Sequence, residues 1–468
     1  MVIEMYIGAA VAVALIACLS IYTGVHIRKN QETNSNGPGI VAGLIMGTLV
    51  GGSSTIGTAQ LAYHYGMSAW WFTLGAGIAC LIQALLYTKP LRKSQCRTLV
   101  GMIGREFGER SGIVASLLNS LGTFINILSQ MIAASAVILV IFPHIGSEWP
   151  LIISAAVMVL YVAFGGTKGA GMAGILKLCM LYAAMLLCAV AAVKLFGGGT
   201  NVISSVRLLS EETGINYFSL LARGAGEDLG ACLSLILGVL TTQTYAQALL
   251  SAKTTRSAKQ GGLIAAILIP PIGICGILVG LYMRNITDPG TFVSKTALTR
   301  FVMEQFPPLL AGVILGTLFI ASVGTGAGLS LGIATIMRCD VLPHFAKKAV
   351  DPKKQWIIIV AVLAFACVLS LGSLGDIILN FAFMSMGLRG TVLFIPLCFA
   401  LWLPGKINYR FALLSMVISP LVVLAFGTVL SGYTSIDPLF MGVLCSVVIM
   451  AVGFAHREHA TIQGRRGT

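Results

Sequence analysis

Long apolar runs, separated by short polar segments, recur along the whole chain. The runs 5–27 and 438–454 meet or approach the roughly 20 residues that a helix needs to cross a bilayer. The pattern predicts thirteen membrane-spanning helices, near 4–27, 38–64, 68–88, 112–143, 149–165, 170–196, 228–247, 260–284, 308–338, 355–373, 375–402, 408–431 and 435–455. We therefore expect an all-α polytopic membrane protein.

Two of the predicted spans are interrupted by polar residues and glycine. "TLVGGSSTIGTAQ" (48–60) lies within the second span, and "ILGVLTTQTYAQALL" (236–250) covers most of the seventh. Broken backbone is tolerated at membrane depth only where protein or a water-filled cavity satisfies its polar groups. Close helix packing through small residues is an alternative explanation of either stretch taken alone. Their corresponding positions predict two broken helices that share a central site.

The order of the spans indicates an internal repeat. Without the first span and the last two, ten spans remain, and they form two sets of five with opposite orientation. This is the layout of inverted-repeat transporters, which break the first helix of each repeat near the midplane. We expect one transmembrane domain over 1–468, with an extra N-terminal helix at 4–27, repeats at 38–196 and 228–402, and two C-terminal helices at 408–455.

Composition and charge agree with this membrane assignment. Of the 468 residues, 57% are hydrophobic and 10% are charged, against about 25% charged residues in soluble domains. The net charge of +14 follows from topology, because 22 of the 30 Lys and Arg fall on one side of the predicted spans and six on the other. The positive-inside rule then predicts an N-out, C-in orientation. We expect contact with a lipid bilayer, no nucleic-acid partner and no obligate protein partner.

The side chains of the spans do not suggest an enzyme. The eleven Cys and six His are scattered, without metal-ligand spacing, and no acidic residue lies at mid-depth in a predicted span. A membrane enzyme would need a nucleophile and base, a metal cluster or a carboxylate pair at that depth. We expect neither catalytic residues nor an organic cofactor. A channel or a solute sensor remains an alternative on the same fold, although no added signalling domain is present.

Polar residues of three spans predict a binding site for a small organic solute. Asn119, Thr123, Asn126 and Gln130 share one face of the fourth span, because their spacing is four, three and four. Hydrogen bonding between helices would explain these residues equally well. The expected substrate-binding set is Gly51, Gly52, Ser53, Ser54, Thr55, Asn119, Thr123, Asn126, Thr241, Thr242, Gln243 and Tyr245.

Three stretches carry a family resemblance: "VGGSSTIGTAQLAYHYGMSAWWF" (50–72), "TTQTYAQALLSAKTTRSAKQGG" (241–262) and "ASVGTGAGLSLGIATIMRCDVL" (321–342). They resemble the sodium:solute symporter family. The resemblance implies a LeuT-like fold of thirteen helices and import driven by sodium. It also implies a sodium site, made of carbonyl groups of Gly47, Val50 and Ala321 and the hydroxyl of Thr325. Gly324 belongs to the same set, but it stands where the family usually has a second hydroxyl.

Three further residues are candidates for coupling or gating. Gln247 completes a Gln-x-x-x-Gln pattern that the family shares, and Lys177 and Arg389 are cations inside predicted spans. Lys177 lies three residues after Gly174, the place of an Asp in many relatives. It either extends to the cytoplasmic face or occupies the ion site, where it would couple transport to protons (H+) instead of sodium (Na+).

Arg389 also has more than one possible role. An ionisable residue within the membrane is a functional hypothesis by default. Arg389 would hold a substrate carboxylate, organise a gate, or bond the carbonyl groups of a broken helix. The sequence as a whole predicts a sodium-coupled importer of a small organic solute in the plasma membrane, of the bacterial inner-membrane type.

Overall fold

The computed structural model describes residues 2–29, 36–96, 98–146, 148–345, 355–372, 377–428 and 437–466. Across these ranges the backbone is helical, and the only β-type pairing in them is an isolated bridge between Asn36 and Ala252. The predicted all-α fold class is therefore confirmed.

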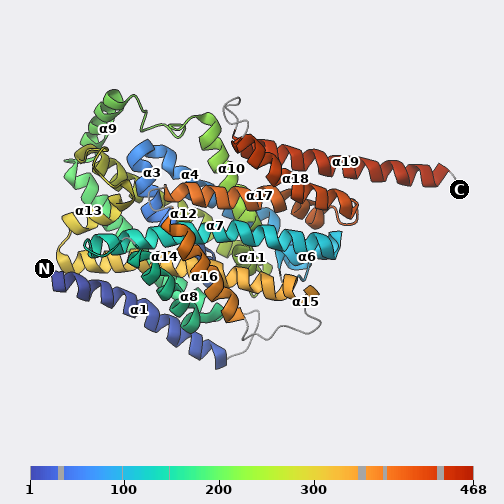
Figure 1. The fold of residues 1–468 in the computed structure, drawn as a ribbon, viewed down its shortest axis with the longest axis horizontal. Coiled ribbons are helices and arrows are strands. Elements are labelled where there is room, and N and C mark those ends of the chain that lie inside the picture. The colour runs from blue at the N-terminus through green and yellow to red at the C-terminus, as the bar shows by residue number, and fades with distance from the viewer. Residues whose placement is uncertain are drawn as a thin grey trace.

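Nineteen α-helices are assigned within the described residues (Figure 1). They are α1 (Val2–Lys29), α2 (Pro38–Leu49), α3 (Thr58–Tyr65), α4 (Trp71–Ile82), α5 (Thr88–Lys93), α6 (Leu99–Phe107), α7 (Glu109–Ile141), α8 (Trp149–Leu195), α9 (Gly199–Thr213), α10 (Ala225–Thr241), α11 (Gln243–Leu250), α12 (Thr255–Ile286), α13 (Ala297–Gln305), α14 (Pro308–Ile336), α15 (Leu342–Phe345), α16 (Gln355–Leu371), α17 (Ile378–Trp402), α18 (Tyr409–Thr428) and α19 (Pro438–Arg466). Short π and 3-10 segments join several of them, among them η1 (Ser53–Gly57).

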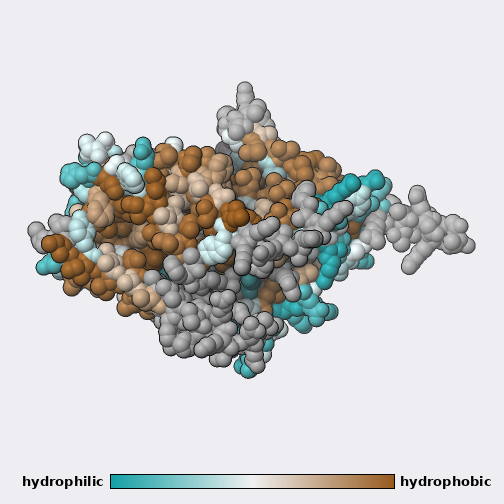
Figure 2. Space-filling model, turned by 60° about the horizontal axis from the view of Figure 1, so that its bottom comes forward, coloured by the Kyte–Doolittle hydropathy of each residue, from teal (hydrophilic) through white to brown (hydrophobic). Residues whose placement is uncertain are grey.

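The surface and the lengths of the helices fit a membrane protein. A broad hydrophobic band covers the visible face, with hydrophilic residues gathered toward its two ends (Figure 2). Eight helical segments within the described residues are long and apolar enough to cross a membrane, or nine when the bent pair α10 and α11 counts as one span. The number of thirteen spans and the N-out, C-in orientation stay predictions. The structure also assigns one helix, α8, where the sequence predicted spans at 149–165 and 170–196.

The helices at the two ends of the chain lie at the edges of the bundle (Figure 1). α1 packs against α8 and α14, and α18 packs against α19. Glycines allow the close approach of α1 and α14, because a Cβ on Gly312 would come within 2.0 Å of the Met5 carbonyl oxygen. The first helix and the last two thus lie outside the helices that carry the predicted site.

Two helices are broken where the sequence predicted the breaks. α2 ends at Leu49, Val50 is extended, and the helix resumes at Ser53. α10 and α11 meet at Thr242, which is also extended, with a bend of 47° between them. α2 packs against α8, α12 and α14, whereas α10 packs against α4 and α17. The two broken helices therefore pack against different sets of neighbouring helices.

Candidate functional site

The first break is held by one side chain of α7. The Gly52 amide donates a hydrogen bond of 2.9 Å to Gln130 Oε1, and Gln130 Nε2 donates one of 2.7 Å to Ser53 Oγ. The Gly51 amide donates to Ser54 Oγ at 2.9 Å. These bonds satisfy backbone donors that the break removes from the helix. Only glycine fits at Gly51, because a Cβ there would lie 2.7 Å from Gln130 Oε1.

The predicted cation-site residues converge between α2 and α14. Thr325 Oγ1 donates a hydrogen bond of 3.0 Å to the Ala321 carbonyl oxygen and lies 3.5 Å from the carbonyl oxygen of Val50. Lys177 joins them from α8. Its Nζ donates to the Gly47 carbonyl oxygen at 2.8 Å and to Thr325 Oγ1 at 3.0 Å. An ammonium group therefore stands among the oxygen atoms predicted to hold sodium.

A close crossing of α2 and α8 explains how Lys177 reaches this position. A Cβ on Gly174 would lie 2.7 Å from the Gly43 carbonyl oxygen and 3.5 Å from Gly47 Cα, so the two backbones are in direct contact. Lys177 follows Gly174 by one helical turn, which directs it along the same face of α8. Its side chain is 2% exposed. The interpretation that Lys177 extends to the cytoplasmic face is therefore wrong.

The oxygen atoms left at this place fit sodium poorly. Gly324 supplies no hydroxyl, and a Cβ there would meet the Tyr161 ring at 3.4 Å. The nearby hydroxyl of Ser322 donates to the Leu318 carbonyl oxygen at 2.9 Å, and its side chain packs against Gly52. Lys177 already uses two of the four expected ligand oxygens. A sodium ion would have to displace this ammonium group before it could bind there.

Arg389 of α17 stands at the second break. Its Nη1 donates to Thr242 Oγ1 at 2.7 Å, and its Nε and Nη2 donate to the backbone oxygen and the hydroxyl of Ser385 at 3.2 and 3.0 Å. Nη2 also contacts Met386 Sδ at 3.0 Å. The side chain is fully buried. Arg389 thus contacts the broken helix through the hydroxyl of Thr242 and not through a backbone carbonyl group. All of the hydrogen-bond partners of Arg389 named here are neutral.

An amide side chain without a partner lies close to Arg389. Both side-chain atoms of Asn119, which is 1% exposed, lack a hydrogen-bond partner among the described residues. α7 and α17 run antiparallel, since Ser129 Oγ donates to the Ile378 carbonyl oxygen and Ser385 Oγ to that of Gly122. A Cβ on Gly122 would also meet Arg389 Cγ at 2.6 Å. This register brings Asn119, one turn from Gly122, level with Arg389.

The other predicted substrate-binding residues divide into two groups. The hydroxyls of Ser54, Thr55, Thr123, Thr241 and Thr242 donate to carbonyl groups at most one turn away on their own helices. Ser53 and Asn126 instead bond to α7 or within it, at Ser129 and Gln130, and Tyr245 is buried on α11. The first group satisfies itself, as hydroxyls in helices often do.

The two glutamines of the Gln-x-x-x-Gln pattern differ in their surroundings. Gln243 Oε1 accepts a hydrogen bond of 2.8 Å from the Leu99 amide and so caps the start of α6. Gln247 is exposed on α11, whereas Lys177 and Arg389 are buried. Within the described residues, neither of these buried cations forms an ion pair with a carboxylate.

Several residues of the site were absent from the predicted set. Gln130, Ser129 and Ser385 all bond across helices at the breaks. Helical periodicity placed Gln130 on the same face as Asn119, Thr123 and Asn126, but only those three entered the predicted binding set. Ser129 and Ser385 carried no such signal, because serine is common in helices that pack closely.

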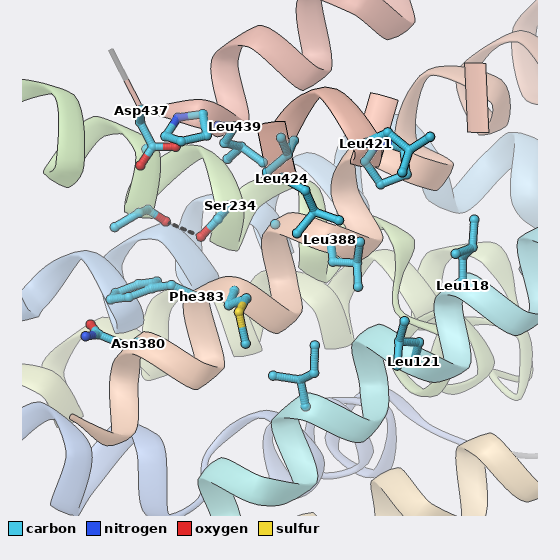
Figure 3. A pocket seen from close by; sticks show the side chains of 18 of the residues that line it. Leu118, Leu121, Ser234, Asn380, Phe383, Leu388, Leu421, Leu424, Asp437 and Leu439 are labelled. Carbon is cyan, nitrogen blue, oxygen red and sulfur yellow. Dashed lines mark hydrogen bonds between the residues drawn. The ribbon is translucent and has the colours of Figure 1, made fainter. Parts of the chain in front are cut away.

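A separate groove of about 770 Å³ lies between α7, α10, α17, α18 and the start of α19 (Figure 3). Leu118 and Leu121 of α7 face Leu388, Leu421 and Leu424 across it (Figure 3). Its wall is almost entirely apolar. Lys177, Arg389 and both helix breaks are absent from its lining. The groove is therefore distinct from the polar site.

Comparison with known proteins gives matches over most of the chain. The model of the sodium:solute symporter family matches residues 37–419. A high-affinity choline transporter of Caenorhabditis elegans is 24% identical over 76% of this chain, which spans 65% of that transporter's length. The sodium/pantothenate symporter of Escherichia coli is 21% identical over 90% of this chain and 88% of its own. A monocarboxylic acid transporter of Corynebacterium glutamicum is 21% identical, over 60% of this chain and 54% of its own.

Solved structures match the fold over nearly its whole length. A Na+-coupled sialic acid symporter, in a substrate-bound outward-open state, superposes with a TM-score of 0.76 and 17% identity, covering 97% of both chains. The nucleobase-cation-symport-1 family transporter Mhp1 gives a TM-score of 0.59 at 13% identity, over 92% of this chain and 94% of its own. The predicted LeuT-like class of fold is supported by these neighbours.

Proposed function

This chain belongs to the sodium:solute symporter family, and from that premise we propose that it imports a small organic solute by secondary active symport. The relatives named above are transporters, and this chain is a transporter, not an enzyme. Family membership and the fold of a Na+-coupled symporter support coupling to a sodium gradient. We place the protein in the plasma membrane, of the bacterial inner-membrane type.

One observation carries the proposal: both helices predicted to be broken are broken, and each break is lined by buried polar side chains. Gln130 bonds the break after α2, and Arg389 bonds the break after α10. Transporters of this kind bind their solute and ion at such breaks and expose the site to each side in turn. Rocking of one five-helix set, 38–196, against the other, 228–402, would provide that alternating access.

The charges of the site favour an organic anion, and we propose a carboxylate as the solute's binding group. Lys177 and Arg389 are buried cations without a carboxylate partner among the described residues, and Asn119 beside Arg389 has unsatisfied donors and acceptors. Arginine binds carboxylates through two parallel hydrogen bonds. Pantothenate and monocarboxylic acids, named for two relatives, carry this group, whereas choline is a cation.

Proton-coupled symport is a second candidate, and Lys177 is the observation that favours it. Its ammonium group already supplies the positive charge among the oxygens of Gly47 and Thr325. A lysine can lose and regain that charge with a proton, without leaving its helix.

The test is uptake into proteoliposomes that contain the purified protein. Labelled pantothenate and short monocarboxylates are compared with choline, each under an inward sodium gradient and, separately, under an inward proton gradient without sodium. Saturable uptake of a carboxylate, accumulated against its gradient, supports the proposal. Uptake of choline and of none of the acids would contradict the proposed substrate class, and flux that neither saturates nor responds to an ion gradient would indicate a channel.

Arg389→Gln and Arg389→Lys separate the roles of the guanidinium group. A hydrogen bond to a charged group contributes about 1.5–3 kcal/mol, so we expect Arg389→Gln to lower carboxylate affinity by roughly 10–100-fold. Arg389→Lys keeps the charge but loses the two parallel hydrogen bonds, so affinity should fall in this variant too. Thr391→Ala is the matched control, because it removes a hydroxyl of the same helix that bonds carbonyl groups of that helix and leaves Arg389 unchanged. Full affinity in Arg389→Lys would contradict a bidentate clamp.

A further inference from the structure

Lys177 bonds two of the oxygen atoms predicted to hold the cation, those of Gly47 and Thr325. We propose that its ammonium group is a tethered cation that occupies this site in place of sodium, so that sodium binds there only when the lysine is removed. This inference rests on the proposed transport function, and its consequence is that transport needs no sodium ion at this position. The occupancy itself can be tested without any solute.

The hydrogen bonds make the lysine and a sodium ion alternatives. Thr325 Oγ1 uses its own hydrogen to bond the Ala321 carbonyl oxygen at 3.0 Å, so its lone pairs are free to accept from Lys177 Nζ. The Gly47 carbonyl oxygen accepts from the same Nζ at 2.8 Å. A sodium ion would need these same lone pairs. It would also stand against a positive charge at contact distance in a medium of low dielectric constant, where repulsion is strongest.

The surrounding helices hold the lysine in place. The backbone contact of Gly174 with Gly43 brings α8 so near to α2 that Lys177 spans the remaining distance. With 2% of its surface exposed, the side chain is enclosed by protein. Its charge meets no carboxylate among the described residues, so the oxygen atoms of α2 and α14 are its compensation. These are groups that bind a small cation in the same way.

A missing ligand agrees with this exchange. Gly324 offers no hydroxyl, and the nearest atoms to a Cβ placed there belong to the Tyr161 side chain, at 3.4 Å or more. Serine therefore fits at this position with ordinary contacts. A site that is filled by an ammonium group with two hydrogen bonds does not need the additional oxygen that a sodium ion would use. The absence of a hydroxyl and the presence of the lysine are thus two independent features of one site.

The experiment follows the melting temperature of the purified protein as sodium replaces potassium or choline at constant ionic strength and pH. A ligand of the folded state raises stability according to its concentration and dissociation constant. We expect no sodium-specific rise in the wild type or in Gly324→Ser, which keeps the lysine. We expect a rise of about 2–5 °C in Lys177→Met and a larger one in Lys177→Met combined with Gly324→Ser. Adding Thr325→Ala should abolish it.

Lys194→Met is the matched control, since Lys194 is an exposed lysine on the same helix. It should behave as the wild type does. A sodium-specific rise in the wild type that Thr325→Ala removes would overturn the inference, as would the absence of any rise in both Lys177→Met variants. If those variants do not fold, the wild type and Gly324→Ser decide the question. A sodium response that depends on Thr325 would refute occupancy of the site by the lysine. The absence of a sodium response would support it.

Uptake separates this inference from the proposed function. Sodium-dependent carboxylate uptake that Thr325→Ala abolishes would support the proposed transport function and refute the tethered cation. A sodium response that appears only without Lys177, in a protein that moves no carboxylate, would support the tethered cation and contradict the proposed solute.

Discussion

Gly174→Ala tests the helix contact that brings Lys177 to its position. The added methyl group would lie 2.7 Å from the Gly43 carbonyl oxygen, and ordinary contacts begin at 3.4 Å, so α2 and α8 must separate by about 0.7 Å. Overpacking of this kind costs about 1–3 kcal/mol, and the better helix propensity of alanine returns about 1 kcal/mol. We expect a net loss of about 0–2 kcal/mol in the free energy of unfolding.

The assay is thermal unfolding in detergent, with Gly39→Ala as the control. Unfolding entropy of about 2.1 cal/mol/K per residue gives about 1 kcal/mol/K for 468 residues, so Gly174→Ala should lower the melting temperature by up to about 2 °C. Gly39 lies on α2 with no atom within 4 Å of an added Cβ, and alanine there should stabilise by about 0.4–1 kcal/mol. Equal stabilisation by both substitutions would refute the close contact of α2 and α8.

Three further substitutions test other parts of the structure. Gln130→Ala leaves the buried Gly52 amide without its acceptor and should cost about 1–3 kcal/mol in thermal unfolding, whereas a loss near zero would show that the break does not depend on it. Arg92→Ala removes three hydrogen bonds to carbonyl groups at the end of α11 and should lower the melting temperature; Lys93→Ala on the same helix is the control, and equal effects would contradict the capping role. Asp437 lies directly before the candidate span Pro438–His456, and burial raises the pKa of its carboxyl group. The folded chain therefore holds this proton more tightly than the unfolded chain does, and it loses stability as the pH rises through that pKa. Asp437→Asn should therefore stabilise at pH 7 and leave stability unchanged at acidic pH, and a stability that falls at pH 7 would contradict this reasoning.

The breaks could be predicted from the sequence because their physical cause is local. Gly51 and Gly52 beside hydroxyl residues, within an apolar run, indicate backbone that cannot remain a regular helix in lipid. The same holds for the cluster at Thr242, where the structure has the second break. The apolar runs likewise predicted the helices, since the length of a span follows from the thickness of the bilayer.

The partners of the buried cations could not be predicted in this way. Lys177 reaches the predicted ion site through the crossing of α2 and α8 at Gly174, and a crossing depends on contacts between residues far apart in the sequence. Gln243 looked like a site residue because it follows the second break, yet its amide points to Leu99. The direction of a polar side chain depends on which neighbour offers a hydrogen-bond partner. For Gln243 that partner is the Leu99 amide at the start of α6.

The most direct test of the central claim is a count of sodium ions on the purified protein. Equilibrium binding of radioactive sodium would be measured on the wild type and on Lys177→Met combined with Gly324→Ser. If Lys177 fills the cation site, the variant binds one more sodium ion than the wild type, and Thr325→Ala removes that ion. Equal binding by the two proteins, lost from the wild type on Thr325→Ala, would show that sodium holds the site and that the lysine does not.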